Sequence, residues 1–210
     1  NVTYEERCIL KDINWTIKKN EFWHLVGPNG SGKTTLLAMI YGNNTKGYGQ
    51  EVYLFGQKKG SGESVWDIKQ KIGYISPAML ELFKRGHTVE HMIISGFYDS
   101  IGLYQTPSTL QIQAAAQWLD VLNLTQEKNT SFLKVSPATQ RLILIARAMI
   151  KHPPLLILDE PLINVDDKGR ALIPALINKI AKESETSILF VAHRDEANIN
   201  PDFTYELHPS

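Results

Sequence analysis

The sequence predicts an α/β fold with a mostly parallel central sheet that is flanked by helices. Two continuous apolar runs of strand length, at 155–158 and Ser187–Ala192, are separated by segments of helical composition. Shorter runs at Phe22–Val26 and Ile72–Ile75 add further strands. Strands that are apolar at every position are buried on both faces, which is typical of parallel sheets covered by helices.

The remaining elements follow from local pattern. The alternation around 9–17 and the run at 51–55 predict short strands that form a small antiparallel part, and Lys33–Tyr41 has helical composition. Helices are also expected near 139–151 and 168–184, while 78–134 reads as mostly helical. Tryptophans more often pack than bind ligands, so we expect packing roles for three of them: Trp23, Trp66 and Trp118.

Length and composition limit the possible classes. A chain of 210 residues with 43% hydrophobic residues fits one large α/β domain with a substantial core. Lys plus Arg and Asp plus Glu both number 22, so the net charge of zero gives no strong nucleic-acid signal. The single cysteine, Cys8, excludes an internal disulfide, and no apolar run reaches the roughly 18 residues of a membrane span. We therefore expect a cytoplasmic location, with any position at the inner face of a membrane depending on a partner.

A glycine-rich loop at 27–35, called the phosphate loop below, matches the pattern G-x-x-x-x-G-K-[ST] between a strand and a helix. Glycines let backbone N–H groups approach phosphate oxygens, and the helix that follows adds a partial positive charge. Lys33 is expected to contact the β and γ phosphates, and the Thr34 hydroxyl to bind magnesium. The expected nucleotide-binding residues of this loop are Gly27, Pro28, Asn29, Gly30, Ser31, Gly32, Lys33, Thr34 and Thr35.

Acidic and imidazole side chains follow the two long apolar runs. Asp159 and Glu160 come directly after one strand, and His193 follows the other. Ligands of open α/β sheets bind at the carboxyl ends of strands. Asp159 is therefore expected near the magnesium, Glu160 beside the attacking water, and His193 within reach of a γ-phosphate.

In this order and at these spacings, the three elements resemble an ABC-type ATPase over essentially the whole chain. The resemblance implies ATP and Mg²⁺ as ligands and a single domain. Its core and β subdomain would comprise 1–77 and 141–210, and an inserted helical subdomain 78–140. It also implies a head-to-tail dimer with a second cassette that shares two ATP sites. By the same resemblance, Tyr4 would stack on adenine, and Asp166 would lie in a loop that crosses the dimer interface.

The closer likeness is to the ModF group, bacterial ATPases linked by name to molybdenum transport and also called photorepair proteins. Three stretches carry this likeness: 60–69, 95–104 and 140–161. Members of the group typically carry two cassettes in one polypeptide.

Two positions depart from the ABC pattern. Pro77 stands where the family places a glutamine that links the metal site to a transporter. The signature loop, usually Leu-Ser-Gly-Gly-Gln, reads Val-Ser-Pro-Ala-Thr at 135–139. Pro137 has no N–H for the partner's γ-phosphate and Ala138 adopts left-handed conformations poorly, whereas Ser136 could still cap the helix and contact phosphate.

Three functions remain open from the sequence. The first is ATP hydrolysis in a two-cassette assembly with a membrane permease as a further partner. The second is a non-transport ATPase in repair, regulation or translation, which the missing glutamine favours. The third is an ATP-dependent dimerisation switch with little turnover, which the degenerate signature loop favours and the intact Glu160 opposes.

Overall fold

The computed structural model describes residues 2–4, 7–10, 13–42, 51–83 and 86–209, with side chains from Leu10 onward within these ranges. Tyr4 and Cys8 belong to strands of this description, but their side chains lie outside it.

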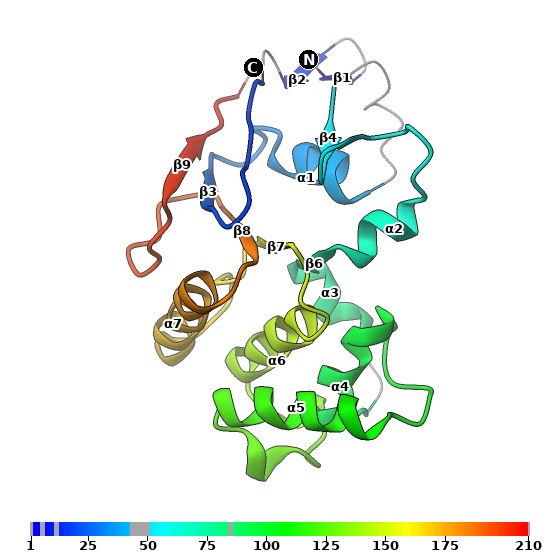
Figure 1. Ribbon diagram of the computed structural model, residues 1–210. Coiled ribbons are helices and arrows are strands. Elements are labelled where there is room, and N and C mark those ends of the chain that lie inside the picture. The colour runs from blue at the N-terminus through cyan, green and yellow to red at the C-terminus, as the bar shows by residue number, and fades with distance from the viewer. Residues whose placement is uncertain (1, 5–6, 11–12, 43–50, 84–85, 210) are drawn as a thin grey trace.

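The elements alternate between strands and helices along the chain (Figure 1). The strands are β1 (Val2–Tyr4), β2 (Arg7–Leu10), β3 (Phe22–Val26), β4 (Tyr53–Leu54), β5 (Gln57–Lys58), β6 (Ile72–Ile75), β7 (Leu155–Asp159), β8 (Ser187–Ala192) and β9 (Phe203–Glu206). The α-helices are α1 (Lys33–Tyr41), α2 (Val65–Gln70), α3 (Pro77–Leu82), α4 (Val89–Ile94), α5 (Thr109–Val121), α6 (Pro137–Met149) and α7 (Asp167–Glu183). Short 3₁₀ turns are η2 (Ser95–Tyr98), η3 (Thr125–Glu127) and η4 (Phe132–Lys134).

The central sheet has five strands in the order β6-β7-β8-β3-β9, and every neighbouring pair is parallel. Its register pairs Val26 with Ala192 and Asp159 with Val191. The carboxyl ends of β3, β7 and β8 therefore meet at one edge, which we call the site edge. Two small antiparallel pairs, β1-β2 and β4-β5, complete the sheets, and the expected α/β class is confirmed.

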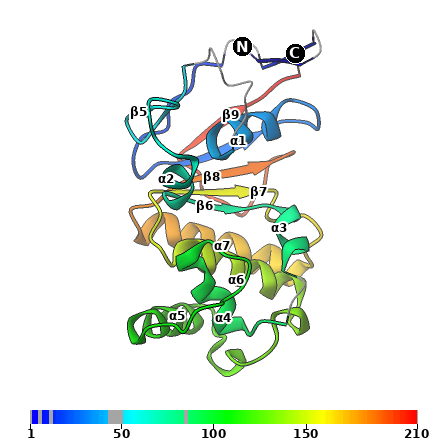
Figure 2. The same cartoon turned by 90° about the vertical axis from the view of Figure 1, so that its right-hand side faces the viewer.

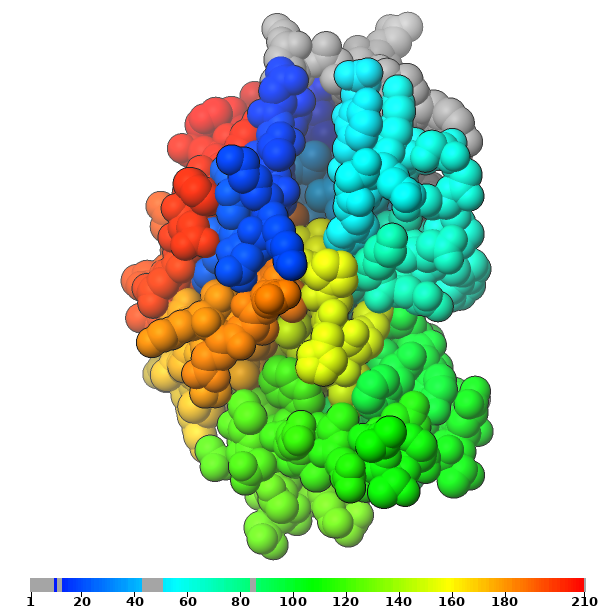
Figure 3. Space-filling model, viewed as in Figure 1, coloured from blue at the N-terminus to red at the C-terminus, as the bar shows by residue number. Residues whose placement is uncertain are grey.

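Helices cover both faces of the sheet (Figure 2). In that view α6 and α7 lie below the strands, α4 and α5 form a further layer beneath these, and α1 lies higher than β8, β7 and β6. One buried cluster joins the strands to α1 and includes Leu25, Leu37 and Ile157. A second cluster joins the opposite face to the lower helices and includes Ile143 and Phe190. In the space-filling view the green helical segment occupies one end of the molecule, and the cyan segment around β4 and β5 lies toward the other (Figure 3).

The β-rich start of the chain is less regular than its alternation predicts. Ile13, Trp15 and Ile17 are half-buried while Asn14 and Thr16 are exposed, yet β2 ends at Leu10. Aromatic packing accounts for the alternation, since Trp15 stacks on Tyr205 at 4.9 Å and meets the Trp23 ring edge-on at 5.3 Å.

Three further expectations need correction. The 51–55 strand is reduced to Tyr53–Leu54, because Phe55 and Gly56 turn at φ 52° and 81°. The helix expected from 139 begins at Pro137, since proline is favoured in a first helical turn. Trp66 does not pack in the core: it is 72% exposed on α2.

Candidate functional site

The phosphate loop connects the end of β3 to the start of α1. Gly30 and Gly32 adopt φ 84° and 96°, a conformation that favours glycine. Five helices, α2, α4, α5, α6 and α7, carry a Ser, Thr or Asp side-chain cap, whereas α1 begins at Gly32 without one. The first N–H groups of a helix have no intrahelical acceptor, so the start of α1 suits an anion.

Lys33 lies beneath this loop. Its side chain is buried, and Nζ donates to the carbonyl oxygens of Gly27 at 2.5 Å and Pro28 at 3.0 Å. An ammonium has three N–H donors, so one remains for a phosphate oxygen. Burial and the two carbonyls thus hold a full positive charge where the loop surrounds it.

The loop is tightly packed at one end and open at the other. A Cβ on Gly27 would overlap the carbonyl oxygen of Leu207, which follows β9. Ser31 is buried, and its Oγ has no hydrogen-bond partner among the described residues. Pro28, Asn29 and Thr34 are exposed and Thr35 is half-buried, so the face toward solvent carries the Thr34 side chain.

Asp159 ends β7 at the site edge. Burial raises the pKa of its carboxyl, and the charge of Glu160 adds to this rise, whereas a hydrogen bond from Tyr74 and the charge of Lys33 lower it. The Tyr74 hydroxyl lies 3.5 Å from Asp159 Oδ2. Burial, followed by the charge of Asp159, raises the pKa of Tyr74 to about 12, so its hydroxyl stays protonated and can donate.

Glu160 and His193 form a direct pair. Glu160 Oε2 lies 3.0 Å from His193 Nδ1. Glu160 adopts φ 48°, in the left-handed region, and its N–H donates to the Val191 carbonyl at 2.9 Å. A non-glycine residue in this region is strained by about 1–2 kcal/mol, and such strain is concentrated at functional sites. The backbone bond to β8 therefore holds a strained residue with its carboxylate against the imidazole.

The metal-binding groups of this edge are few. No cluster of three or more His, Cys, Asp or Glu side chains able to hold a metal occurs in the described parts of the chain. Mg²⁺ is commonly held by one or two protein ligands together with phosphates and water. A set of one carboxylate, Asp159, and one hydroxyl, Thr34, fits that chemistry.

The other expected nucleotide contacts are Ser136 at the start of α6, Asp166 at the start of α7, and Tyr4. Ser136 is exposed and caps α6, accepting from the Thr139 N–H at 3.1 Å. Asp166 is exposed and caps α7, accepting from the Gly169 N–H at 2.9 Å. The Tyr4 side chain lies outside the described residues. The structure thus brings together Lys33, Asp159, Glu160 and His193, but neither Ser136 nor Asp166 is seen hydrogen-bonded to them.

Sequence reasoning missed two polar residues. Tyr74 is paired with Ile157 in the register of β6 and β7, which places it on the same face as Asp159. The alternation of side chains along β6 could have predicted that Tyr74 lies on this face. Arg141 is buried within α6 and donates from Nη2 to the Ile163 carbonyl at 3.4 Å. The sequence gives no signal for Arg141, because most arginines on helices are exposed.

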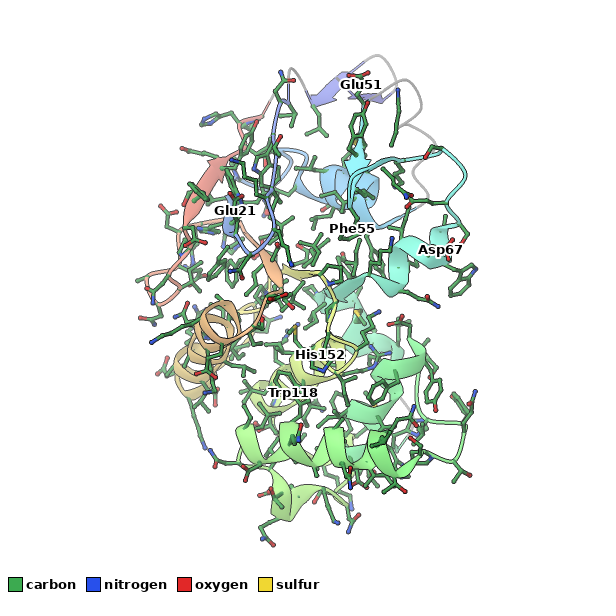
Figure 4. The ribbon with its side chains drawn as sticks, viewed as in Figure 1. Glu21, Glu51, Phe55, Asp67, Trp118 and His152 are labelled. Carbon is green, nitrogen blue, oxygen red and sulfur yellow. The ribbon has the colours of Figure 1, made fainter. Side chains whose placement is uncertain are left out.

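A separate cavity of about 690 Å³ lies between α5, α7 and the turn after α6. Trp118 and His152, which lie close together in Figure 4, both line it. Pro154 and Thr186, also in its lining, precede β7 and β8. The cavity is therefore at the opposite edge of the sheet and contains none of the expected site residues.

Comparison with known proteins agrees with this geometry. The family model described as "ABC transporter" matches residues 10–163. The chain is similar to the ABC transporter ATP-binding protein ModF of Escherichia coli, with 44% identity over 93% of the chain and 40% of ModF. It is also similar to YlmA of Bacillus subtilis, an uncharacterized ABC transporter ATP-binding protein, with 37% identity over 90% of the chain and 72% of YlmA.

Among solved structures, a dimeric post-hydrolysis ATP-binding cassette bound to ADP and Pi matches with a TM-score of 0.71 and 26% identity. The match covers 89% of this chain and 80% of that one. The chain spans only about 40% of the length of ModF. The resemblance read from the sequence is confirmed: this chain belongs to the ABC transporter family of ATP-binding ATPase domains.

Proposed function

We propose that this chain binds ATP with Mg²⁺ on the phosphate loop and hydrolyses it to ADP and phosphate, as one cassette of a two-cassette assembly. The observation that carries this proposal is the site edge itself. The uncapped start of α1 and the buried Lys33 lie at the edge where β7 and β8 present Asp159, Glu160 and His193.

The residues of this edge have separate roles. Residues 27–35 contact the phosphates, and Lys33 contributes the charge of its remaining N–H donor. Thr34 and Asp159 hold the metal, which when bound neutralises charge on the phosphates. Glu160 polarises the attacking water as general base, while His193 orients the Glu160 carboxylate and donates to developing charge.

The assembly supplies the rest of the site. Tyr4 stacks on adenine, while Ser136 and Asp166 reach the nucleotide of the facing cassette. The exposure of Ser136 and Asp166 supports their part of this proposal, as does the dimeric state of the related cassette with ADP and Pi. Because Pro137 lacks an N–H donor, we infer that the productive partner is a second, different cassette. This chain covers only 40% of the length of ModF, so the rest of ModF is long enough for a second cassette.

The wider role that we propose is in transport. A permease at the inner face of a membrane is proposed as a further partner because relatives are named ABC transporter proteins. Co-fractionation with a membrane subunit would support it, whereas a complex found only in the non-membrane fraction would contradict it. The proline at position 77 favours a non-transport ATPase as the second candidate, since the usual coupling glutamine is missing.

The decisive experiment is ATP hydrolysis by the purified chain over a range of protein concentrations, with Glu160→Gln and Lys33→Ala as controls. Turnover that rises faster than concentration and disappears in Glu160→Gln would show a self-sufficient dimer. Binding that Lys33→Ala abolishes, without turnover at any concentration, would point to a composite site or a dimerisation switch. Failure to bind ATP at all would refute the proposal.

A further inference from the structure

Arg141, in the second turn of α6, is a buried cation with unused donors. Its side chain is 3% exposed, and Nη2 donates to the Ile163 carbonyl at 3.4 Å. Nε and Nη1 have no hydrogen-bond partner among the described residues. Burial alone lowers the pKa of this guanidinium. A buried charge without its hydrogen bonds is costly, so this arrangement calls for a physical reason.

A second arginine on the same helix makes the hydrogen bonds that are expected of a structural residue. Arg147 is also buried, but its Nε donates to Ser95 Oγ at 3.0 Å and its Nη2 to the Ser100 carbonyl at 2.8 Å. It therefore ties α6 to the turn that follows α4. Arg141 differs from Arg147 in where its acceptor lies. Among the described residues this acceptor is the Ile163 carbonyl, in the segment that follows the proposed general base Glu160.

That segment, residues 161–165, is called the connecting turn below. It runs from Glu160 to Asp166, and the Ile163 N–H donates back to the Glu160 carbonyl at 3.2 Å. Asn164 adopts φ 54°, so the turn contains a second left-handed residue. The strained Glu160 directly before this short turn means that the shape of the turn depends on contacts from outside.

The start of α6 supplies these contacts. A Cβ on Gly169 would overlap both Val165 and Ala138, so the end of the connecting turn, the start of α7 and the start of α6 are in close packing. Val165 is buried at this junction. The apolar contact fixes one end of the turn, and Arg141 provides the polar contact near its middle.

We propose that Arg141 is a positioning residue that fixes the connecting turn to α6, and that carbonyl oxygens of the turn accept from Nε and Nη1 when the cassettes close on ATP. The planar guanidinium can serve several carbonyls at once, which a lysine cannot. Through this contact, α6, which Ser136 caps, and the connecting turn, which Glu160 and Asp166 flank, move as one body. The role in ATP-driven closure rests on the proposed function.

The test compares Arg141→Met, Arg141→Lys and the matched control Arg147→Met. In the nucleotide-free chain, we expect Arg141→Met to speed hydrogen exchange of amides 162–168 by about fivefold or more, because the turn loses its anchor. Its unfolding midpoint should stay equal or rise, since removal of an uncompensated buried charge is neutral or stabilising. Arg141→Lys should show an intermediate exchange rate.

Turnover gives a second readout. ATP hydrolysis by Arg141→Met should fall about tenfold in kcat with little change in the KM for ATP, because the phosphate loop is untouched. Arg147→Met should lower the unfolding midpoint and leave amide exchange at 162–168 unchanged.

Two results would overturn the inference: unchanged amide exchange at 162–168 in Arg141→Met, or a loss of turnover that only follows a loss of folded protein. If the parent chain does not hydrolyse ATP, the proposed function fails, but the exchange comparison in the nucleotide-free chain still decides the role of Arg141.

Discussion

Glu160 and His193 are in direct contact at the site edge, so replacement of either side chain should lower turnover. Because the imidazole orients the carboxylate, we expect His193→Ala to lower kcat about 100-fold with a small effect on KM. Glu160→Gln should lower it further, and the double variant should be no worse than Glu160→Gln alone, since the two residues act as a unit. Steady-state kinetics of all three, with the exposed His208→Ala as control, measure this. Fully additive losses would show that the pair does not work together.

Tyr74 offers a finer test at the same scale. Its hydroxyl lies 3.5 Å from Asp159 Oδ2 and its ring stacks on Tyr41 at 4.4 Å. Tyr74→Phe keeps the stacking but removes the hydrogen bond, whose net value is about 0.5–1.5 kcal/mol. We therefore expect roughly a threefold to tenfold higher Mg²⁺ requirement for turnover. The control is Tyr41→Phe, which leaves the Tyr74 hydroxyl in place. An equal effect of both substitutions would assign the change to packing.

At the scale of elements, the cap of α6 separates stability from function. Ser136→Ala should lower the free energy of unfolding by about 1 kcal/mol, because the Thr139 N–H loses its acceptor. Ser136→Asp should restore that stability, since aspartate is an equally good cap. Its charge would repel the phosphate of a facing cassette, so ATP-dependent dimerisation should stay impaired. Urea unfolding and ATP-dependent dimerisation assays on the two variants measure this. Normal dimerisation of Ser136→Asp would show that the phosphate of a facing cassette does not lie beside position 136.

The strands show which elements a sequence can predict. β7 and β8 are long apolar runs because both of their faces are buried, while β3 and β6 are shorter, mostly apolar runs, so pattern alone located all four. The edge strand β9 escaped prediction because Phe203 and Thr204 are exposed and its sequence has no apolar run. It is held by tertiary contacts instead: Asp202 Oδ2 accepts from the Phe22 N–H at 2.8 Å, and Phe203 stacks on Trp23.

The site divides in the same way. The phosphate loop, Asp159, Glu160 and His193 follow strand ends, so the sequence predicted that they share one edge. The roles of Tyr74 and Arg141 depend on contacts across elements far apart in the chain, which local pattern does not encode. The packing role predicted for Trp66 was wrong because this residue, of a type that usually packs, stands on the outer face of a short helix.

At the scale of the whole molecule, the proposed function requires a second cassette that completes the site. Within the described ranges no helix combines the length and apolar character needed to cross a membrane. Ser136 and Asp166 are exposed and cap their own helices, and the proposed function assigns them to the phosphate of a facing cassette. The strength of that contact then depends on the backbone around Pro137.

Replacing Pro137 tests whether this backbone limits closure. Pro137→Ala and Pro137→Gly both restore an N–H at the first position of α6, and a hydrogen bond to a charged acceptor contributes about 1.5–3 kcal/mol. In a Glu160→Gln background, we expect the ATP-bound homodimer to form about tenfold more tightly with either substitution. Analytical ultracentrifugation with and without ATP measures this, and Pro107→Ala, before α5, is the matched control. A gain only in Pro137→Gly would assign the limit to backbone freedom at 137 and not to the missing donor. If neither variant dimerises better than its parent, the 135–139 loop does not face phosphate and the case for a different partner cassette is lost.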